Sequence, residues 1–371
     1  MKKTKQLVTI GLLATGLVAL YGCSSDAMQE EGGGNIQSVE LKIQTSVEMA
    51  RAAIGTEGVV KGEAFQAGDA IAVYANSTHY NTTSNNYAVY TAASDGSSLS
   101  WSVVGAGSKI YLSTEKTKIY AVYPSTLTVE HSSSAVTDNT NATGLNLFEG
   151  SDTSTDESTR IAVPNSAATP PVYTANGEKD YMYAEPVADK TANDNSASLT
   201  MKHALAMISF KFYKDATFIG TGSLTKVVLK NIDESSTTLK TGSASMAVNN
   251  GNISNEQDGT NKSLTRYPYT ETTAGYTLTT ITDGDKSNLP AFGMLVYPNT
   301  SLQANKLQAV FTIDNVEYPV NIPAATTNNN EWAAGYNTTY TVKMSGKEPT
   351  LSVSVTKWQD APVNSELTPI N

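Results

Sequence analysis

Short stretches in which apolar and polar residues strictly alternate recur along the chain, and they constrain its fold more than any other feature. The first is the range 38–47, where five apolar or β-branched residues face one side and polar residues the other: Val39, Leu41, Ile43, Thr45 and Val47. A period of two predicts a half-buried β-strand. No long stretch shows the 3.6-residue period of an amphipathic helix. The sequence therefore predicts an all-β protein.

Strands of the same kind are predicted at 65–75 (after a turn), 99–104, 109–112, 118–123 and 180–187, and then at 199–213, 224–232, 244–248, 276–281, 291–297, 307–313, 316–322, 336–344 and 351–358. Asp314-Asn315 is a hairpin signal. The Ser-, Thr-, Asn- and Asp-rich range 132–156 predicts a long surface excursion. A polar break at 189–196 places a domain boundary there, to within about ten residues. We expect two tandem antiparallel β-sandwiches, at 38–195 and 196–371.

The beginning of the chain has the layout of a secretory signal. Three lysines precede an apolar segment of about 15 residues, roughly 22 Å as a helix, which is too short to cross a ~30 Å hydrocarbon core. The segment ends in Leu20-Tyr21-Gly22-Cys23, which resembles the bacterial lipobox. This predicts a signal peptide at 1–22, cleavage between Gly22 and Cys23, and lipidation of Cys23. The alternative is an ordinary secretory signal with a chance cysteine.

An acidic, glycine-rich tether is predicted at 23–37, because this range has nothing to bury. Its acids resemble the surface-export signal of Bacteroidetes lipoproteins, although a short acidic linker can also be merely soluble. Removing the three lysines of the signal takes the formal charge from −10 to −13, since 25 basic residues become 22 against 35 acidic ones. Such a chain repels phosphate backbones, which argues against a nucleic-acid partner.

No catalytic or metal-binding constellation is visible. His79, His131 and His203 are scattered, and the simplest interpretation is structural or surface histidines. The range 283–287 imitates the start of a calcium loop, but Asn288 and Met294 stand where glycine and glutamate are needed, so it is read as a turn. We expect no enzyme, no cofactor and no metal.

Several motifs together resemble the fimbrillin family of Bacteroidales, the subunits of lipoprotein-derived (type V) pili. They are Phe65-Gln66-Ala67-Gly68-Asp69-Ala70-Ile71-Ala72-Val73-Tyr74, Tyr120-Ala121-Val122-Tyr123-Pro124, Met201-Lys202-His203-Ala204-Leu205-Ala206, the range 332–341 and the range 353–358. The resemblance implies two transthyretin-like, Greek-key sandwich domains. It also implies delivery to the outer membrane as a lipoprotein, adhesion, and polymerisation with other fimbrial subunits by strand exchange.

In the family's mechanism, the range 38–51 would complete the N-terminal sandwich as a removable first strand through Val39, Leu41, Ile43 and Val47. A trypsin-like surface protease would cut between Arg51 and Ala52. Losing that strand leaves an open sheet edge, which demands a replacement. The expected donor is the C-terminal segment 351–371 of a neighbouring subunit, with its apolar face entering the groove: Leu351, Val353 and Val355.

Three alternatives stay open at this point. Trp358 lies on the opposite face from Val355, so the donor can include the tail residues Val363, Leu367 and Ile370. Arg51 can instead be a loop residue between two permanent strands. In a different functional class, the chain would be a monomeric surface lipoprotein that binds glycans through tyrosines and tryptophans. The sequence does not distinguish a stalk subunit from a tip subunit.

Overall fold

The structure is a computed structural model, and it describes residues 38–47, 51–54, 60–63, 65–76, 86–95, 98–103, 109–131, 135–147, 179–233, 238–258, 263–270, 273–282, 284–325, 331–346 and 348–357. Every regular element in these ranges is a β-strand, which confirms the all-β prediction. The same ranges contain no helix long and apolar enough to cross a membrane.

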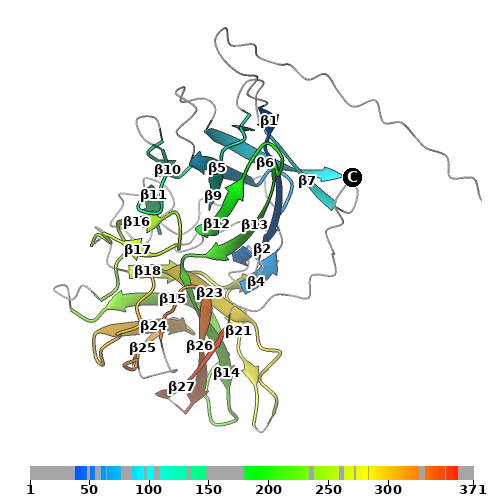
Figure 1. The fold of residues 1–371 in the computed structure, drawn as a ribbon. Coiled ribbons are helices and arrows are strands. Elements are labelled where there is room, and N and C mark those ends of the chain that lie inside the picture. Colours follow the sequence, from blue (N-terminus) through cyan, green and yellow to red (C-terminus); the bar gives the residue numbers. More distant parts are fainter. Residues whose placement is uncertain are drawn as a thin grey trace, which may run out of the picture.

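The largest sheet has seven strands and forms the upper part of Figure 1. Its order is β2 (Lys42–Val47), β13 (Ser196–His203), β12 (Met182–Lys190), β9 (Thr117–Tyr123), β5 (Ala70–Asn76), β6 (Tyr87–Asp95) and β7 (Ser98–Val103). β2 runs parallel to β13, and the other pairings in the sheet are antiparallel. β2 and β7 are therefore its two edges.

Both faces of this sheet are buried at its centre. On β5, Ile71 and Val73 belong to one apolar cluster, while Ala72 and Tyr74 belong to another on the opposite face. A two-stranded sheet, β1 (Val39–Glu40) with β8 (Tyr111–Leu112), contributes Leu112 to the first cluster. Because both faces are covered, β5 is a continuous buried run instead of an alternating one.

A four-stranded sheet joins the two halves of the chain. Its order is β10 (Thr128–Val129), β11 (Asn141–Asn146), β16 (Ser243–Ala247) and β17 (Ile253–Ser254). β11 of the first half pairs antiparallel with β16 of the second. The predicted surface excursion at 132–156 is wrong for its described part, because three apolar side chains there are buried in the core: Val136, Leu145 and Leu147.

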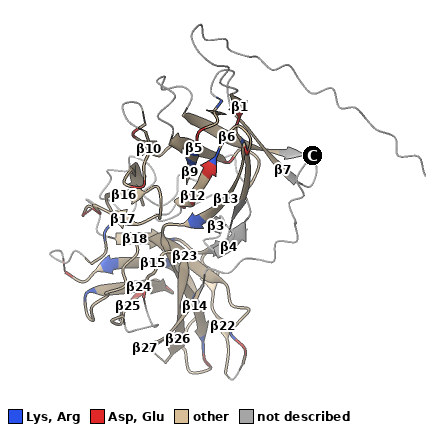
Figure 2. Cartoon of the chain, viewed as in Figure 1, with Lys and Arg blue, Asp and Glu red and all other residues tan. Residues whose placement is uncertain are grey.

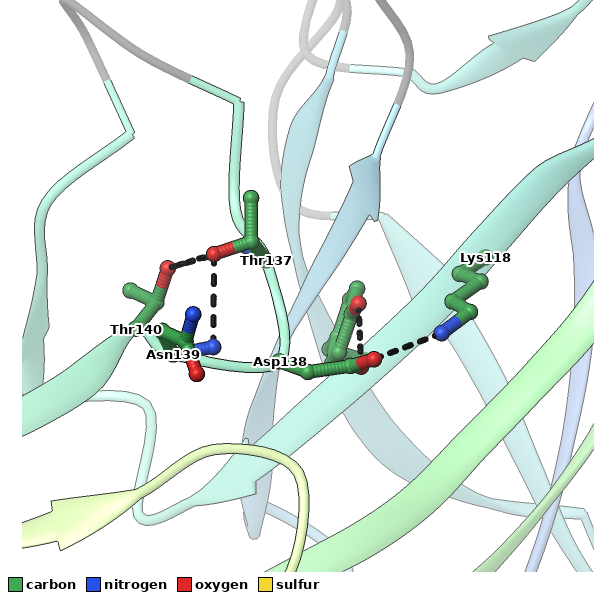
Figure 3. Close-up of polar contacts among 6 residues, drawn as sticks. Lys118, Thr137, Asp138, Asn139 and Thr140 are labelled. Atoms are coloured by element: carbon green, nitrogen blue, oxygen red, sulfur yellow. Dashed lines mark hydrogen bonds and ion pairs between the residues drawn. The ribbon is translucent and has the colours of Figure 1, made fainter.

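Asp138 ties the turn before β11 to the seven-stranded sheet (Figure 3). Its carboxylate accepts hydrogen bonds from Lys118 Nζ at 2.7 Å and from the Tyr120 hydroxyl at 2.9 Å. The turn itself is closed by the Thr140 amide, which donates to the Thr137 carbonyl at 3.0 Å. The hydrogen bonds from Lys118 and Tyr120 hold the pKa of Asp138 below its ordinary value of 3.8. The carboxylate is therefore ionised at neutral pH, as this contact requires.

The second half of the chain forms a sandwich of two five-stranded sheets. One sheet has the order β22 (Thr279–Thr280), β14 (Ala206–Lys214), β26 (Tyr336–Ser345) and β27 (Glu348–Lys357), with β23 (Ala291–Val296) also paired to β14. The other has the order β18 (Ser263–Arg266), β15 (Ser223–Asn231), β24 (Leu307–Ile313) and β25 (Val316–Asn321), with β21 (Tyr276–Thr277) also paired to β15. Two hairpins complete the described strands, β3 (Arg51–Ile54) with β4 (Val60–Glu63) and β19 (Tyr269–Thr270) with β20 (Thr273–Ala274).

Aromatic side chains fill the space between these two sheets. Phe311 of β24 meets Phe210 and Phe212 of β14 edge to face, with ring centroids 5.5 and 4.9 Å apart. Tyr340 of β26 stacks on Phe210 at 5.3 Å. Edge-to-face and offset-stacked pairs each add about 0.5–1.5 kcal/mol beyond area burial. The Asp314-Asn315 hairpin prediction is confirmed: the two residues join β24 to β25, both with positive φ, 50° and 64°.

The range 199–213 was predicted as one strand, and this is wrong. β13 ends at His203 and β14 begins at Ala206, and the two strands lie in different sheets. The apolar pattern runs through Ala204 and Leu205 because both are buried in the core shared by the two halves. Because β13 belongs to the seven-stranded sheet, the first half of the chain extends to His203, whereas the sequence predicted a domain boundary between residues 195 and 196.

Candidate assembly interface

The segment predicted to be removable lies at one edge of the seven-stranded sheet. β1 pairs antiparallel with β8, with Val39 opposite Leu112. β2 pairs in parallel with β13, with Ile43 opposite Ala197 and Val47 opposite Met201. We call the range 39–47 the strap. Each of its two strands has a single neighbour in its sheet, so removing the strap interrupts no other pairing.

Leu41 is the main anchor of the strap. Its side chain is 1% exposed and belongs to the apolar cluster on one face of the sheet. Its amide donates to the Ile110 carbonyl at 2.8 Å, and the Tyr90 hydroxyl donates to the Leu41 carbonyl at 3.2 Å. Burial, and then the nearby charge of Glu40, raise the pKa of Tyr90, so this hydroxyl keeps its proton.

Asn195 and Lys109 make further polar contacts with the strap. The Asn195 side-chain amide donates to the Glu40 carbonyl at 2.7 Å, and the Lys42 amide donates to the Asn195 carbonyl at 2.8 Å. Lys109 and Glu40 form an ion pair at 2.8 Å with side chains 43% and 39% exposed. Solvent screens an exposed pair of this kind, so it contributes little to stability. The strap is therefore held mainly by Leu41 and by backbone hydrogen bonds.

The remaining strap residues keep the predicted alternation. Thr45 is buried, and Val39 and Ile43 are half-buried, whereas Lys42 and Gln44 are exposed. The side chain of Val47 lies outside the described residues. Loss of the strap would uncover the outer backbone edge of β13 together with the apolar pocket around Leu41.

Arg51 and Ala52, the predicted cleavage pair, lie in β3. Arg51 pairs with Glu63 and Ala52 with Gly62 of β4. The backbone is thus strand and not the loop of the alternative reading. A protease that binds its substrate as an added strand needs an unpaired segment, so cutting here requires the β3–β4 hairpin to open.

The predicted donor residues lie on β27, the outermost strand of its sheet. β27 pairs antiparallel with β26 from Ser345↔Glu348 to Tyr336↔Lys357. Leu351 and Val353 are half-buried and pack against the core, and Val355 is half-buried, while Ser352 and Ser354 are exposed. In this structure the segment completes its own subunit's sheet. Trp358 and the tail to residue 371 lie outside the described residues.

The edge strand β25 of the facing sheet differs from β27 in where proline stands. β25 carries Pro319 at its centre, opposite Val310. Proline has no amide hydrogen and blunts a sheet edge against further pairing. β27 has no proline and no charged residue between Pro349 and Lys357. Of these two edges, β27 is the one whose backbone can pair with another strand.

The remaining sequence predictions have mixed outcomes. Gly22, Cys23, His79 and the tether lie outside the described residues, so the lipidation site stays a prediction. His131 lies against Tyr87, with ring centroids 4.5 Å apart. His203 Nδ1 and Asp180 Oδ2 form a buried contact at 2.9 Å, a structural role as expected. Asp285 accepts hydrogen bonds from the Ser287 amide and hydroxyl, which confirms a turn.

Charge and metal ligands add no further site in the described ranges. No group of three or more His, Cys, Asp or Glu side chains there could hold a metal ion. In the described part of Figure 2, acidic and basic positions are interleaved, and no continuous basic stripe crosses the view. The residues that hold the strap, Tyr90 and Asn195, were missed by sequence reasoning because nothing local marks them.

Comparisons with known proteins agree with this architecture. The Fimbrillin-like family model matches residues 51–358. A solved structure of a candidate cell-adhesion protein from Bacteroides uniformis superposes with a TM-score of 0.51 at 17% identity, covering 87% of this chain and 99% of that one. A second, from Bacteroides ovatus, gives 0.52 at 14%, covering 87% and 98%. No curated protein sequence matches. Because the family model covers most of the chain, from the β3–β4 hairpin to the end of β27, this protein is a member of the fimbrillin-like family.

Proposed function

We propose that this protein is a subunit, of the stalk or of the tip, of a type V fimbria that mediates adhesion. It is exported as a lipoprotein through Cys23, cut after Arg51 by a trypsin-like protease, and polymerised by exchange of strands between copies. Membership of the fimbrillin-like family already makes it a structural, cell-surface fimbrial protein and not an enzyme. The observation that carries the finer proposal is the strap, an edge element whose two strands each pair with a single neighbour among the described strands.

The donor segment has the same inward pattern as the strap. Reading both in the same direction, Leu351 corresponds to Leu41 and Val353 to Ile43. At the next inward position, Val355 corresponds to Thr45. The intervening positions are polar and outward in both segments. The match sets a register in which β27 of one copy runs parallel to β13 of the next, with Val353 beside Ala197.

Burial favours the exchange. Leu351 and Val353 are half-buried at the edge of their own sheet, whereas Leu41 is 1% exposed in its pocket. Full burial of a Leu stabilises by about 1.5–3 kcal/mol, so Leu351 gains about 1 kcal/mol on going from half to full burial in the place of Leu41. Val353 would take the place of Ile43, which is itself half-buried, so its burial stays about the same. The hydrogen bonds to β26 are replaced by bonds to β13 and β8. The exchange trades the ten residue pairs between β27 and β26 for the eight that the strap makes, two with β8 and six with β13, and it is favoured by the burial of Leu351.

Engineered disulfides test this register. Ser198 faces Gln44 in the present structure, and Ser354 takes the position of Gln44 in the exchanged one. Ser198→Cys with Ser354→Cys should therefore link neighbouring copies when the 52–371 chain polymerises under oxidation. Thr339→Cys with Ser354→Cys reports the unexchanged state, because Thr339 and Ser354 pair within one subunit.

Thr200→Cys with Ser354→Cys, two residues out of register, is the matched control. We expect a non-reducing ladder from the first pair, and little from the control. Intramolecular linkage of Thr339 with Ser354 in assembled fibres, without the ladder, would show that β27 stays in its own sheet and is not the donor.

A further inference from the structure

A cavity of about 480 Å³ lies where the seven-stranded sheet meets the second half of the chain, and assembly does not account for it. Its walls come from Tyr183 of β12 and Lys202 of β13, from the turn 250–253 between β16 and β17, and from the range 334–336 at the start of β26. These elements belong to three different sheets. The cavity exists only when both halves are docked, and its size is that of a ligand site.

The absence of a side chain at Gly251 leaves room for the Tyr183 ring. Gly251 has a φ of +70°, and a methyl group at this position would overlap the Tyr183 ring. The turn is fixed by the Gly251 amide, which donates to the Ala247 carbonyl at 2.9 Å, and by the Asn252 amide, which donates to Asn250 Oδ1 at 3.0 Å. One wall of the cavity is thus the aromatic ring of Tyr183 on β12, packed against the turn that joins β16 to β17.

The charges around the cavity do not suit an ionic ligand. Two basic residues line the cavity, and both already have acidic partners: the Lys202 ammonium lies 2.7 Å from Glu185 Oε1, and His203 Nδ1 lies 2.9 Å from Asp180 Oδ2. Glu256 places a carboxylate in the same wall. An anion would meet Glu256 and an already paired lysine, and the whole chain carries a formal charge of −10. A neutral ligand fits this lining better than a charged one.

The remaining lining combines aromatic surface with side-chain amides. Tyr183 and Tyr336 offer rings, and Asn250 and Asn252 offer both donors and acceptors. A sugar ring presents C–H groups on its face and hydroxyls at its rim, which need these two kinds of partner. We propose that this cavity binds a neutral saccharide unit of a surface glycan. The site is that of the unexchanged subunit, in which Tyr336 pairs with Lys357 of β27.

A glycan array tests the proposal with the purified full chain. The array carries neutral mannosyl, galactosyl and N-acetylglucosaminyl oligosaccharides, with sialylated and sulfated members as the anionic set. The strongest neutral member is then titrated calorimetrically. Tyr183→Ala should weaken its binding by about tenfold, the loss of one aromatic contact. Gly251→Ala should weaken it similarly by displacing the ring.

Tyr213→Ala is the control, because Tyr213 is half-buried on β14 and does not line the cavity. Thermal melting of each variant separates lost binding from lost folding, and Tyr336→Ala replaces Tyr183→Ala if the latter fails to fold. The proposal is overturned if no neutral member binds at millimolar concentration, or if Tyr183→Ala and Gly251→Ala bind as well as the parent. It is equally overturned if only anionic members bind and Lys202→Ala abolishes that binding.

Discussion

Replacing Leu41 by alanine should loosen the strap without unfolding the rest of the molecule. Leu41 is 1% exposed, and among the strap side chains that the structure describes it is the one large apolar side chain that is fully buried. A buried Leu→Ala change costs about 2–5 kcal/mol. Because the strap lies at a sheet edge and can open locally, most of this cost should appear in its own opening equilibrium.

Hydrogen exchange followed by mass spectrometry measures that equilibrium directly. A loss of about 2 kcal/mol corresponds to roughly 30-fold faster exchange of the amides in 39–47. The amides of β14, in the centre of the other half, should keep their rates. Trypsin gives a second readout, since cleavage after Lys42, the first residue of β2, requires the same opening.

Gln44→Ala is the matched control, because Gln44 lies on the same strand and is exposed. It should leave both exchange and cleavage within about twofold of the parent. If Leu41→Ala accelerates exchange equally in β2 and β14, the strap opens only with the whole protein, and a separately removable strand is refuted. Unchanged exchange in β2 would refute the anchoring role of Leu41.

The other predictions concern anchoring, maturation, the donor and acid stability. Cys23→Ser should abolish metabolic labelling with palmitate and surface display; persistent labelling would rule out this lipid site. Arg51→Ala should give an uncut, lipid-tethered monomer, so normal fibres of this variant by electron microscopy would place the processing elsewhere. Val353→Asp should block assembly of folded subunits far more than Ser352→Asp, because only the first would bury an unpaired carboxylate in the groove; equal assembly by light scattering would refute the assigned inward face. Hydrogen bonds from the hydroxyl of Thr217, and then from Lys343 and Ser345, hold the pKa of Asp215 well below its ordinary value of 3.8. Its contribution to stability is thus present above about pH 4 and lost as pH falls through the lower folded value, so Asp215→Asn should flatten the decline of the melting temperature below pH 4, and an unchanged decline would contradict this.

The structure adds one requirement to the proposed cleavage after Arg51 and to the proposed transfer of β27 to a neighbouring subunit. Both proposed active segments are paired strands in the subunit as it stands, Arg51 on β3 and Leu351 on β27. Processing therefore needs a local opening at each place. Under the proposed mechanism, kinetic control of assembly lies in the edge strands, where pairing to a single neighbour makes opening least costly.

The local alternation of apolar and polar residues is sufficient to predict those strands that have one buried face and one polar face. β2, β26 and β27 alternate strictly, since one face is buried and the other is polar. The Asp314-Asn315 turn was also predictable, because few residues other than glycine and asparagine or aspartate adopt positive φ. The family resemblance rested on short motifs in the same local stretches.

Strand partners could not be predicted, because pairing joins residues that are far apart in the chain. Asn195 holds the carbonyl of Glu40 across 155 positions, and no spacing rule connects them. The break between β13 and β14 was hidden, since burial in the shared core keeps Ala204 and Leu205 apolar where the chain changes sheets. The sequence by itself determined the class of fold and the inward faces of the strap and of β27. Only the tertiary structure decided that the strap is an edge strand beside β13, and that Tyr183 meets Gly251 at a cavity, because both depend on how separate sheets dock.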